Sequence, residues 1–389
     1  METRAGDPGA FARFDLGRVP SPAFVVDAAK VEANCRILAE VAERAGCKVL
    51  LALKAFSMWR LAELIGGHLD GTATSGLWEA RLAAAHYPGE VASYCAAYRS
   101  DAEVEEVARL SDHVIFNTPG QRDRFRPALE RARTAGARFD VGLRINPGYS
   151  TGEVPRYDPA APGSRLGFPV EELTAEHLEG VSGLHVHSLC EQDFPPLEAT
   201  WAHLEPLIAS HFKRLTWLNL GGGHHITRAD YQRDDLVAFL RALKERSGCE
   251  LYLEPGEAVA LDAGILVGSI LDLFDNAGMQ AITDISATCH MPDVVEAPYR
   301  PAMLSEGAGP LVRLGGPSCL AGDVIGDYAI PDAHIDQRFA FLDQAHYSMV
   351  KTTTFNGVPL PSIWLWDSRT DALEEVRSFR WETFRDRLS

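Results

Sequence analysis

A lysine at the end of an apolar run is the first residue of this sequence suited to covalent chemistry. Lys54 closes the segment KVLLALK, where strand-forming neighbours would withdraw its amine from water. Desolvation disfavours the ammonium form, so it lowers the pKa of a lysine and makes the amine nucleophilic toward carbonyl groups. Taken alone, a lysine in this position is more often a strand-end residue that extends into solvent.

Two further segments carry groups that a ligand can use. Gly221, Gly222 and Gly223 follow the apolar run TWLNL, and their lack of side chains lets backbone N–H groups approach a phosphate. Glu254 follows the run ELYLE and would place a carboxylate at the end of a strand. Taken singly, the glycines are also typical of a flexible turn, and the glutamate of an ion-paired surface residue.

A histidine pair ends the run GLHVH. His185 and His187 alternate on one strand, so both side chains point to the same face, and Ser188 follows them. Such a pair suits a metal ion, but no third ligand of fitting spacing follows, so we expect no metal site here. An imidazole at this position also offers a flat ring and a hydrogen-bonding nitrogen.

Eight short apolar runs must position these groups. Helical patterns separate the runs, including 77–86, 121–135 and 228–246, and one more amphipathic helix extends from Asp27 to Gly46. This alternation predicts parallel βα units that close into a (β/α)8 barrel of the TIM type, with a doubly wound open sheet as the alternative. The runs are residues 48–53, 71–75, 91–94, 113–117, 141–145, 183–187, 216–220 and 250–254.

The pattern changes near residue 265. Gly, Pro and short β-rich runs then dominate, with no long amphipathic helix before the last dozen residues, which predicts a mostly antiparallel, barrel-like β domain. We expect the barrel to span 28–265 and the C-terminal β domain to span 266–389 together with residues 1–27.

Composition excludes several functional classes. The 37 basic and 54 acidic residues give a net charge of −17, which repels nucleic acid and anionic lipid and favours a cationic ligand. No apolar stretch approaches the length of a membrane span, and the N-terminus lacks a signal-peptide core, so a cytoplasmic location is expected. Seven scattered cysteines without a C-x-x-C pair argue against a disulfide framework and a structural zinc site.

The candidate groups converge on one rim if the barrel forms, because the C-terminal ends of its strands meet there. A lysine follows the first strand, a histidine ends the sixth, glycines follow the seventh and a glutamate follows the eighth. Pyridoxal phosphate needs a lysine for its aldehyde, an amide cradle for its phosphate, a flat ring over its pyridine and an acid for its nitrogen. The sequence therefore predicts a pyridoxal-phosphate site.

The chain resembles the alanine-racemase-like, fold-type III pyridoxal-phosphate decarboxylases over nearly its whole length. The segments that carry the resemblance are LLALKAFSMW, APGSRLG, GLHVHSLCE, NLGGGHHITR, YLEPGEAVAL, SATCHMPDV, GGPSCLAGDVIGDY and HYSMVKTTTFNG. Within the family, the similarity is strongest to the branch that decarboxylates carboxylated polyamines such as carboxynorspermidine and carboxyspermidine.

The resemblance implies a role for each matching residue. Lys54 matches the lysine that binds the cofactor aldehyde, His185 the imidazole stacked on its ring, and Glu254 the carboxylate at its nitrogen. Cys319 matches a catalytic cysteine that the family delivers across a homodimer interface. The matches at the cofactor phosphate are Ser188, Gly221, Gly222, Gly223 and Tyr347.

Two departures from the family pattern bear on the substrate. Relatives read E-P-G-R, with an arginine on the cofactor phosphate, where this chain has Glu257. Family members that act on basic amino acids carry an acid directly after the cysteine, where this chain has Leu320. The distal amine must therefore be bound differently, which suits a longer polyamine-like substrate, and Glu257, Asp323, His290 and Arg165 are the candidate substrate-binding residues.

Two alternative functions are weighed against this one. The first is decarboxylation of diaminopimelate, lysine or ornithine, which the two departures disfavour. The second is a catalytically inactive, decarboxylase-like binding protein, which the retention of Lys54, Glu254 and Cys319 disfavours.

Overall fold

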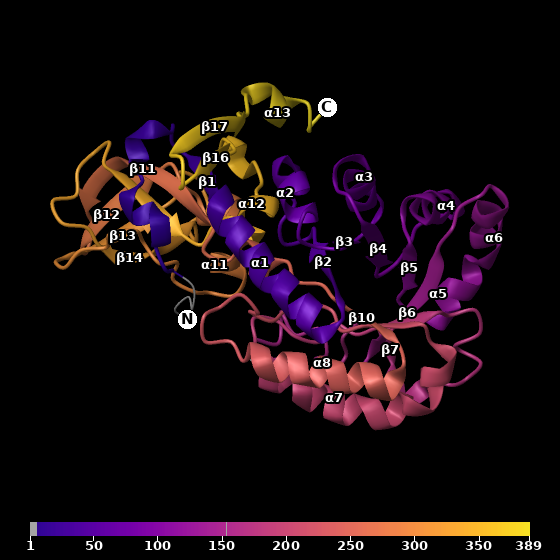
Figure 1. Ribbon diagram of the computed structural model, residues 1–389. Helices are drawn as coiled ribbons and strands as arrows, with labels where there is room; N and C mark the ends of the chain where they lie inside the picture. The colour runs from indigo at the N-terminus through magenta and orange to yellow at the C-terminus, as the bar shows by residue number, and fades with distance from the viewer. Residues whose placement is uncertain (1–5, 153) are drawn as a thin grey trace. The chain divides into compact units, whose positions relative to one another are not determined.

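The computed structural model describes residues 6–152 and 154–389 (Figure 1). It contains two compact units, one within residues 34–259 and one formed by residues 6–33 and 260–389. The division at 33/34 falls within helix α1 (Ala28–Ala45), whereas the sequence analysis placed boundaries at 27/28 and 265/266.

The first unit is built on a closed ring of eight parallel strands. Neighbouring strands pair in parallel around the ring, and the pairing of β5 with β6 completes it, which confirms the predicted barrel and excludes the open sheet. All eight predicted runs form strands, since each is apolar and bounded by turn residues. The strands are β2 (Lys48–Ala52), β3 (Gly71–Thr74), β4 (Glu90–Cys95), β5 (His113–Phe116), β6 (Asp140–Asn146), β8 (Gly183–His185), β9 (Trp217–Asn219) and β10 (Glu250–Leu253), with the short β7 (Phe168–Pro169) paired to β6.

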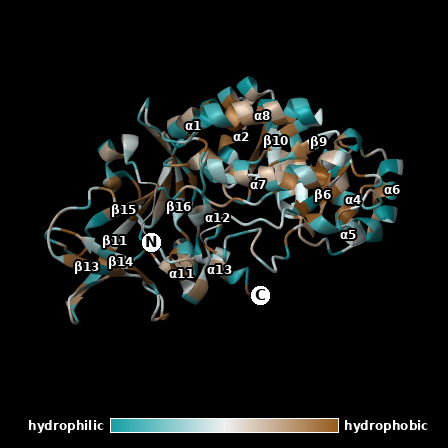
Figure 2. Cartoon of the chain, turned by 90° about the horizontal axis from the view of Figure 1, so that it is seen from below, coloured by the Kyte–Doolittle hydropathy of each residue, from teal (hydrophilic) through white to brown (hydrophobic). Residues whose placement is uncertain are grey.

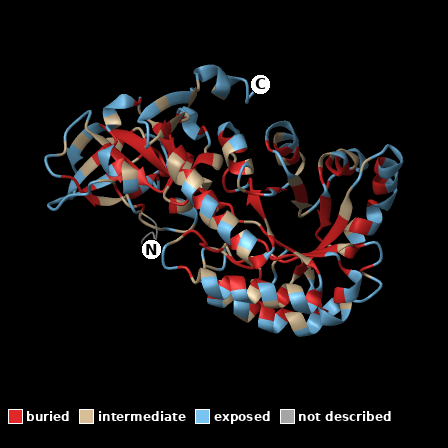
Figure 3. Cartoon of the chain, viewed as in Figure 1, coloured by how far each residue is buried: buried red, intermediate tan, exposed pale blue. Residues whose placement is uncertain are grey.

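Amphipathic helices cover the outside of this ring. In α7 the residues Phe194, Leu197, Trp201, Leu204 and Ile208 are buried at helical spacing, and Figures 2 and 3 show polar, exposed residues on the other faces of α7 and α8. Within the described ranges, no helix combines the length and hydropathy that crossing a membrane requires. The helices are α2 (Ala62–Gly66), α3 (Leu77–His86), α4 (Asp101–Leu110), α5 (Pro119–Arg124), α6 (Arg126–Thr134), α7 (Phe194–Ile208), α8 (Arg233–Ser247) and α9 (Glu257–Ala260).

Two helix predictions need correction. The predicted helix 121–135 is two helices, because Pro127 lacks the N–H that a continuous helix requires and Phe125 leaves helical geometry. The predicted helix 228–246 starts only at Arg233. The segment before it is instead held by side chains, with Arg228 bonded to Asp230 and Asp193.

The barrel interior is closed by an apolar layer around Trp217. Buried side chains from six strands contact one another there, which is possible only inside the ring, and they are Leu50, Ala73, Ala92, Ile115, Trp217 and Tyr252. Gly142 and Gly183 make room for the indole, since a Cβ on Gly183 would lie 1.9 Å from the Trp217 ring. Two glycines inside strands are therefore explained by one large side chain.

The second unit is a mostly antiparallel sheet. Strand β1 (Ala23–Asp27) belongs to it and pairs antiparallel with β11 and parallel with β16. Five of the seven strand pairings that the structure describes in this sheet are antiparallel and two are parallel. Its other strands are β11 (Gly264–Asp275), β12 (Met279–Thr283), β13 (Leu311–Gly315), β14 (Val324–Ala329), β15 (Arg338–Leu342), β16 (Ser362–Asp367) and β17 (Ala372–Arg377), and its helices are α10 (Ala287–His290), α11 (Asp293–Glu296), α12 (Tyr347–Val350) and α13 (Trp381–Arg385).

Candidate active site

Lys54 lies two residues beyond β2, at the C-terminal end of the barrel. Its Nζ is 3.1 Å from Nε2 of His187, which lies two residues beyond β8. The lysine keeps solvent access, but the surrounding protein withdraws the amine from bulk water. This desolvation, assisted by the positive charge of Arg144, lowers the pKa of Lys54, as the sequence analysis predicted for a nucleophilic amine.

A buried carboxylate is held beside the His185 ring. Glu254 Oε2 is 2.9 Å from His185 Nε2, and Asn219 Nδ2 donates to Glu254 Oε1 at 2.7 Å. Burial alone would raise the pKa of Glu254, but the charge and hydrogen bonds of its partners outweigh it and the pKa is lowered. Glu254 is therefore a carboxylate with fixed orientation.

The glycine loop is a turn into which no side chain fits. Gly221 and Gly223 have φ of +70° and +87°, and a Cβ on Gly222 would lie 2.1 Å from the Glu254 carbonyl oxygen. The Gly221 and Gly222 N–H groups donate to Asn219 Oδ1 and His187 Nδ1. The loop therefore both contacts its neighbours closely and orients two side chains of the site.

Three site residues were missed by the sequence analysis. Arg144 is buried in β6, donates to the His187 carbonyl at 3.0 Å and lies 4.6 Å from the centre of the Tyr94 ring. Tyr94 in turn stacks on His185 with ring centres 5.6 Å apart. Asn219 is the third. A charged or amide residue within a buried apolar run, as in VGLRI and TWLNL, is the sequence signal that would have found Arg144 and Asn219.

The other predicted barrel residues lie near this end of the ring. Ser188 is buried just after β8. Arg165 is exposed, its carbonyl accepts from Asn117, and its charge acts on Arg144. Glu257 begins α9, where its carboxylate lies within 4.8 Å of the ligand atoms of Glu191 and His225.

Two predicted substrate-binding residues are hydrogen-bonded within the second unit. His290 Nδ1 accepts from the Ser286 N–H and Nε2 donates to the Pro359 carbonyl, and burial lowers its pKa to about 4. Asp323 accepts from the hydroxyls of Ser286 and Ser318. Contact of His290 and Asp323 with substrate stays a prediction.

Cys319 and Tyr347 also belong to the second unit. Cys319 is exposed in the loop between β13 and β14, and its N–H donates to Asn356 Oδ1 at 2.6 Å. Ser318, directly before it, is fixed by Asp323. Tyr347 begins α12. Their roles in catalysis and phosphate binding stay predictions.

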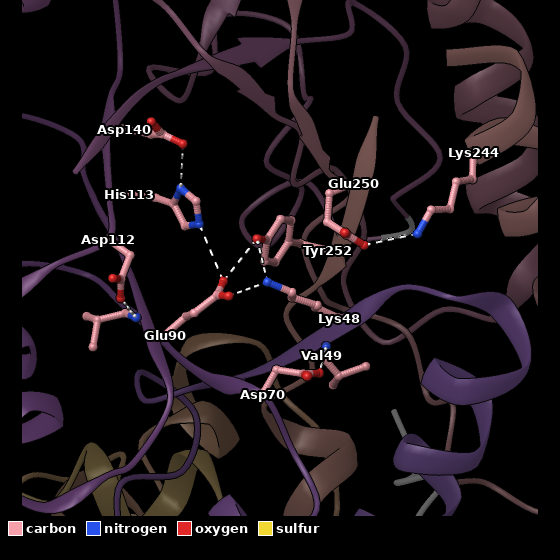
Figure 4. A network of polar contacts seen from close by, with 11 residues as sticks. Lys48, Val49, Asp70, Glu90, Asp112, His113, Asp140, Lys244, Glu250 and Tyr252 are labelled. Atoms are coloured by element: carbon pink, nitrogen blue, oxygen red, sulfur yellow. Dashed lines mark hydrogen bonds and ion pairs between the residues drawn. The ribbon is translucent and has the colours of Figure 1, made fainter. Parts of the chain in front are cut away.

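The N-terminal end of the barrel carries a different set of charges (Figure 4). Lys48 bonds the Glu90 carboxylate, and Tyr252 Oη donates to the other oxygen of that carboxylate at 2.9 Å. His113 lies 3.6 Å from Glu90 and 3.9 Å from Asp140. The contact with His113 is the largest cause that lowers the pKa of Glu90 to about 2, and Lys48 and Tyr252 add to it against the effect of burial.

The groups at the C-terminal end fit pyridoxal phosphate. His185 is 2 % exposed and its Nδ1 is buried without a hydrogen-bond partner among the residues that the structure describes. Its Nε2 is bonded to Glu254, so the ring is held in one orientation, as stacking on a pyridine ring requires. The same end offers an amine for an aldehyde, a fixed carboxylate and a loop in which glycine alone fits.

Comparison with known proteins identifies the family. No family model matches the chain. Over 383 residues the chain is 36% identical to the carboxynorspermidine/carboxyspermidine decarboxylase of Campylobacter jejuni, a match that covers 94% of this chain and 98% of the relative. The chain belongs to the carboxynorspermidine/carboxyspermidine decarboxylase family. A second relative, the carboxyaminopropylagmatine decarboxylase of Synechocystis, is 38% identical over 380 residues and 96% of both chains.

Solved structures agree with this family membership. The Campylobacter jejuni carboxynorspermidine decarboxylase complexed with norspermidine matches with a TM-score of 0.86 at 35% identity, covering 95% of this chain and all of that chain. Diaminopimelate decarboxylase from Helicobacter pylori matches with a TM-score of 0.80 at 16% identity, covering 96% and 98% of the two chains, and this shows a shared fold. This family thus shares its fold with a decarboxylase that is named for a different substrate, diaminopimelate.

Proposed function

We propose that the chain decarboxylates a carboxylated polyamine, carboxynorspermidine or carboxyspermidine, with pyridoxal phosphate bound at the C-terminal end of the barrel. The observation that carries the proposal is the Lys54 amine, which has a lowered pKa and lies 3.1 Å from His187 on the rim that also holds Glu254. The relative of 36% identity over nearly the full chain supports the substrate class.

Each group of the rim has a part in holding the cofactor. Lys54 would bind its aldehyde, His185 would lie against its ring, Glu254 would hydrogen-bond the pyridine nitrogen, and Ser188 with Gly223 of the glycine loop would hold the phosphate. When bound, the protonated pyridine ring accepts the electron pair that remains when the carboxylate leaves as CO2.

The chain's own residues control charge and protons in this reaction. The lowered pKa of Glu254 keeps it ionised, so it favours a proton on the nitrogen that it faces, by a charge-assisted hydrogen bond. A neutral Lys54 amine has the lone pair that nucleophilic attack requires. Cys319, supplied by a second copy of the chain in a homodimer, would donate the proton that replaces the lost carboxylate.

Acidic residues suit the distal amines of such a substrate. Glu191 and Glu257 bring carboxylates close to each other beside His225. Two neighbouring carboxylates attract a cationic amine, and the net charge of −17 assists its approach. We assign Glu257 to this role ahead of a role at the phosphate, because its negative charge would repel a phosphate.

Carboxyaminopropylagmatine is the second candidate substrate, since a relative of 38% identity carries that name. It ends in a guanidinium group in place of an amine, and a carboxylate pair accepts either cation. A cytoplasmic location stays a prediction from the sequence.

Measurement of CO2 release from a panel of substrates tests the proposal. The panel holds carboxynorspermidine, carboxyspermidine, carboxyaminopropylagmatine, diaminopimelate, lysine and ornithine, and Lys54→Ala serves as the inactive control. We expect release from the carboxylated polyamines at a kcat/KM at least about tenfold above that for the amino acids. Equal or faster release from diaminopimelate or lysine would overturn the substrate assignment, and no release from any of them would overturn the activity.

A further inference from the structure

His187 joins the glycine loop to Lys54. The Gly222 N–H donates to Nδ1 of His187 at 3.0 Å, and Nε2 on the other side of the ring is 3.1 Å from Lys54 Nζ. The sequence analysis considered this histidine only as a metal ligand. Its two nitrogens instead form a chain of contacts from a backbone amide to an amine.

The backbone amide fixes the tautomer of the His187 ring. An amide N–H can only donate, so the Nδ1 that receives it must carry a lone pair. A neutral imidazole has one N–H, which must then reside on Nε2. Burial, assisted by the nearby charge of Arg144, lowers the pKa of His187 well below its ordinary value, so the ring is neutral.

This tautomer selects the charge state of Lys54. An ammonium group has three N–H donors and no lone pair, so it cannot accept a hydrogen bond from the Nε2–H of His187, whereas a neutral amine can. We propose that His187 is a positioning residue that holds Lys54 as a neutral amine by donating Nε2–H to its lone pair. The proposal deepens the proposed function and rests on it for the use made of that amine.

The surroundings hold the ring in place. Gly222 accepts no side chain, because its Cβ would collide with the Glu254 carbonyl oxygen. Arg144 fixes the backbone of His187 through its carbonyl. The ring is held both through its backbone and at Nδ1, so it has little freedom to rotate or to adopt the tautomer in which Nε2 accepts a hydrogen bond.

Other charged and titratable groups also act on this pair. Arg144 from β6 disfavours the ammonium form of Lys54, whereas Glu254 after β10, Cys190 after β8 and Glu79 in α3 favour it. His185 and His224 act on His187. Glu254, Cys190 and Glu79 raise the pKa of Lys54 and so oppose a neutral amine. A hydrogen bond from His187 to the lone pair of Lys54 would lower that pKa, and variants of His187 can measure the change.

The ionisation of Lys54 can be measured in the full-length protein freed of cofactor. The chain has six lysines, so trace acetylation at a series of pH values, followed by peptide mass spectrometry, gives the reactivity of each. Lys48 at the start of β2 is an internal control, since its bond to Glu90 holds its pKa above the ordinary value despite burial. We expect Lys54 to be acetylated at a pH well below the value that Lys48 requires.

Variants of His187 separate the N–H donor from burial alone. His187→Phe keeps an apolar ring of similar size and removes the donor, so the pKa of Lys54 should rise by about one unit or more and its acetylation at pH 8 should slow by about tenfold. His187→Gln can offer an amide N–H at the same reach and should restore the wild-type rate to within about threefold. His224→Phe replaces a buried histidine bonded to Tyr231. Burial lowers the pKa of His224 to about 3, so the ring carries no charge at pH 8 and its loss should leave Lys54 unchanged.

The nitrogen chemical shifts of His187 provide a second measurement that does not depend on a variant's folding. In protein with 15N-labelled histidine, Nδ1 should show the shift of a bare nitrogen and Nε2 that of a protonated one. A proton on Nδ1, or an unchanged Lys54 pKa in folded His187→Phe, would overturn the proposal. Neither result depends on CO2 release, so failure of the proposed function would be seen separately.

Discussion

The pKa values of two lysines at opposite ends of the barrel, one at the start of β2 and one just after it, are shifted in opposite directions. Lys48 begins β2 and bonds the Glu90 carboxylate, which raises its pKa although burial alone would lower it. Lys54 follows the same strand, meets a neutral histidine at 3.1 Å, and has a lowered pKa. Desolvation together with the charge of Arg144 therefore lowers the pKa of one lysine, and a carboxylate partner raises the pKa of the other.

The largest test of this comparison exchanges the two lysines for alanine. Lys54→Ala should lose the absorbance of a lysine-bound cofactor and about three decades or more of kcat, because the attacking amine is gone. Lys48→Ala should lower the melting temperature and keep kcat within about threefold. Steady-state kinetics and thermal unfolding check both variants, and normal turnover by Lys54→Ala would contradict the site assignment.

Glu254 is the carboxylate at the C-terminal end of the barrel, as Glu90 is at the N-terminal end, and a variant of Glu254 tests its role in the reaction. Glu254→Gln keeps the size and one acceptor oxygen but loses the charge that favours a protonated pyridine nitrogen. We expect nearly normal cofactor affinity and a decarboxylation rate lower by about two decades. Cofactor titration and single-turnover rates test this, and an unchanged rate would give the carboxylate another role.

A variant of Glu257 tests whether the acidic cluster of Glu257 and Glu191 belongs to the active site at the C-terminal end of the barrel. If Glu257 contacts a substrate amine, Glu257→Gln should raise KM by about tenfold and leave cofactor affinity unchanged. If its role is structural, the same variant should lower the melting temperature and leave KM alone. Tighter cofactor binding in Glu257→Arg would show that the phosphate site accepts the cation that relatives carry.

A variant of Cys319 tests whether the active site at the C-terminal end of the barrel needs a residue from a second copy of the chain. Cys319→Ala should slow product formation or divert it toward an aldehyde. Mixing Lys54→Ala dimers with Cys319→Ala dimers should restore about a quarter of wild-type activity, since random exchange makes half the dimers hybrid, each with one intact site. No recovery after demonstrated exchange would place both residues on one subunit or remove Cys319 from the chemistry.

Glu90 has the smallest expected effect on rate and a clear one on stability. Its folded pKa of about 2 lies below the ordinary 4.5, so its contribution is fully present above pH 4.5 and is lost as the pH falls toward 2. Glu90→Gln should lower the free energy of unfolding by about 1–3 kcal/mol at pH 7 and flatten its dependence on pH in that window. Urea unfolding at a series of pH values measures both, and an unchanged slope would mean that Glu90 is unpaired.

Most of the barrel and the positions of its reactive groups were predictable, for a physical reason. Apolar runs bounded by turn residues mark strands, and parallel strands bring their C-terminal ends to one rim, so Lys54, His185 and Glu254 were expected together. The contacts of Arg144 and Tyr94 were not, because a run buried on both faces does not reveal which side chains point inward. The break at Pro127 was readable from the sequence and was overlooked.

The indole of Trp217 packs against Gly142 and Gly183 between the two ends of the barrel. It lies in an apolar layer with Tyr252 and meets His113 edge to face at 5.0 Å. Moving a charge through such a layer is costly, since mainly apolar side chains line it. The apolar layer therefore separates the charges around Glu90 from Lys54, so that a stabilising lysine begins strand β2 and a reactive lysine follows it.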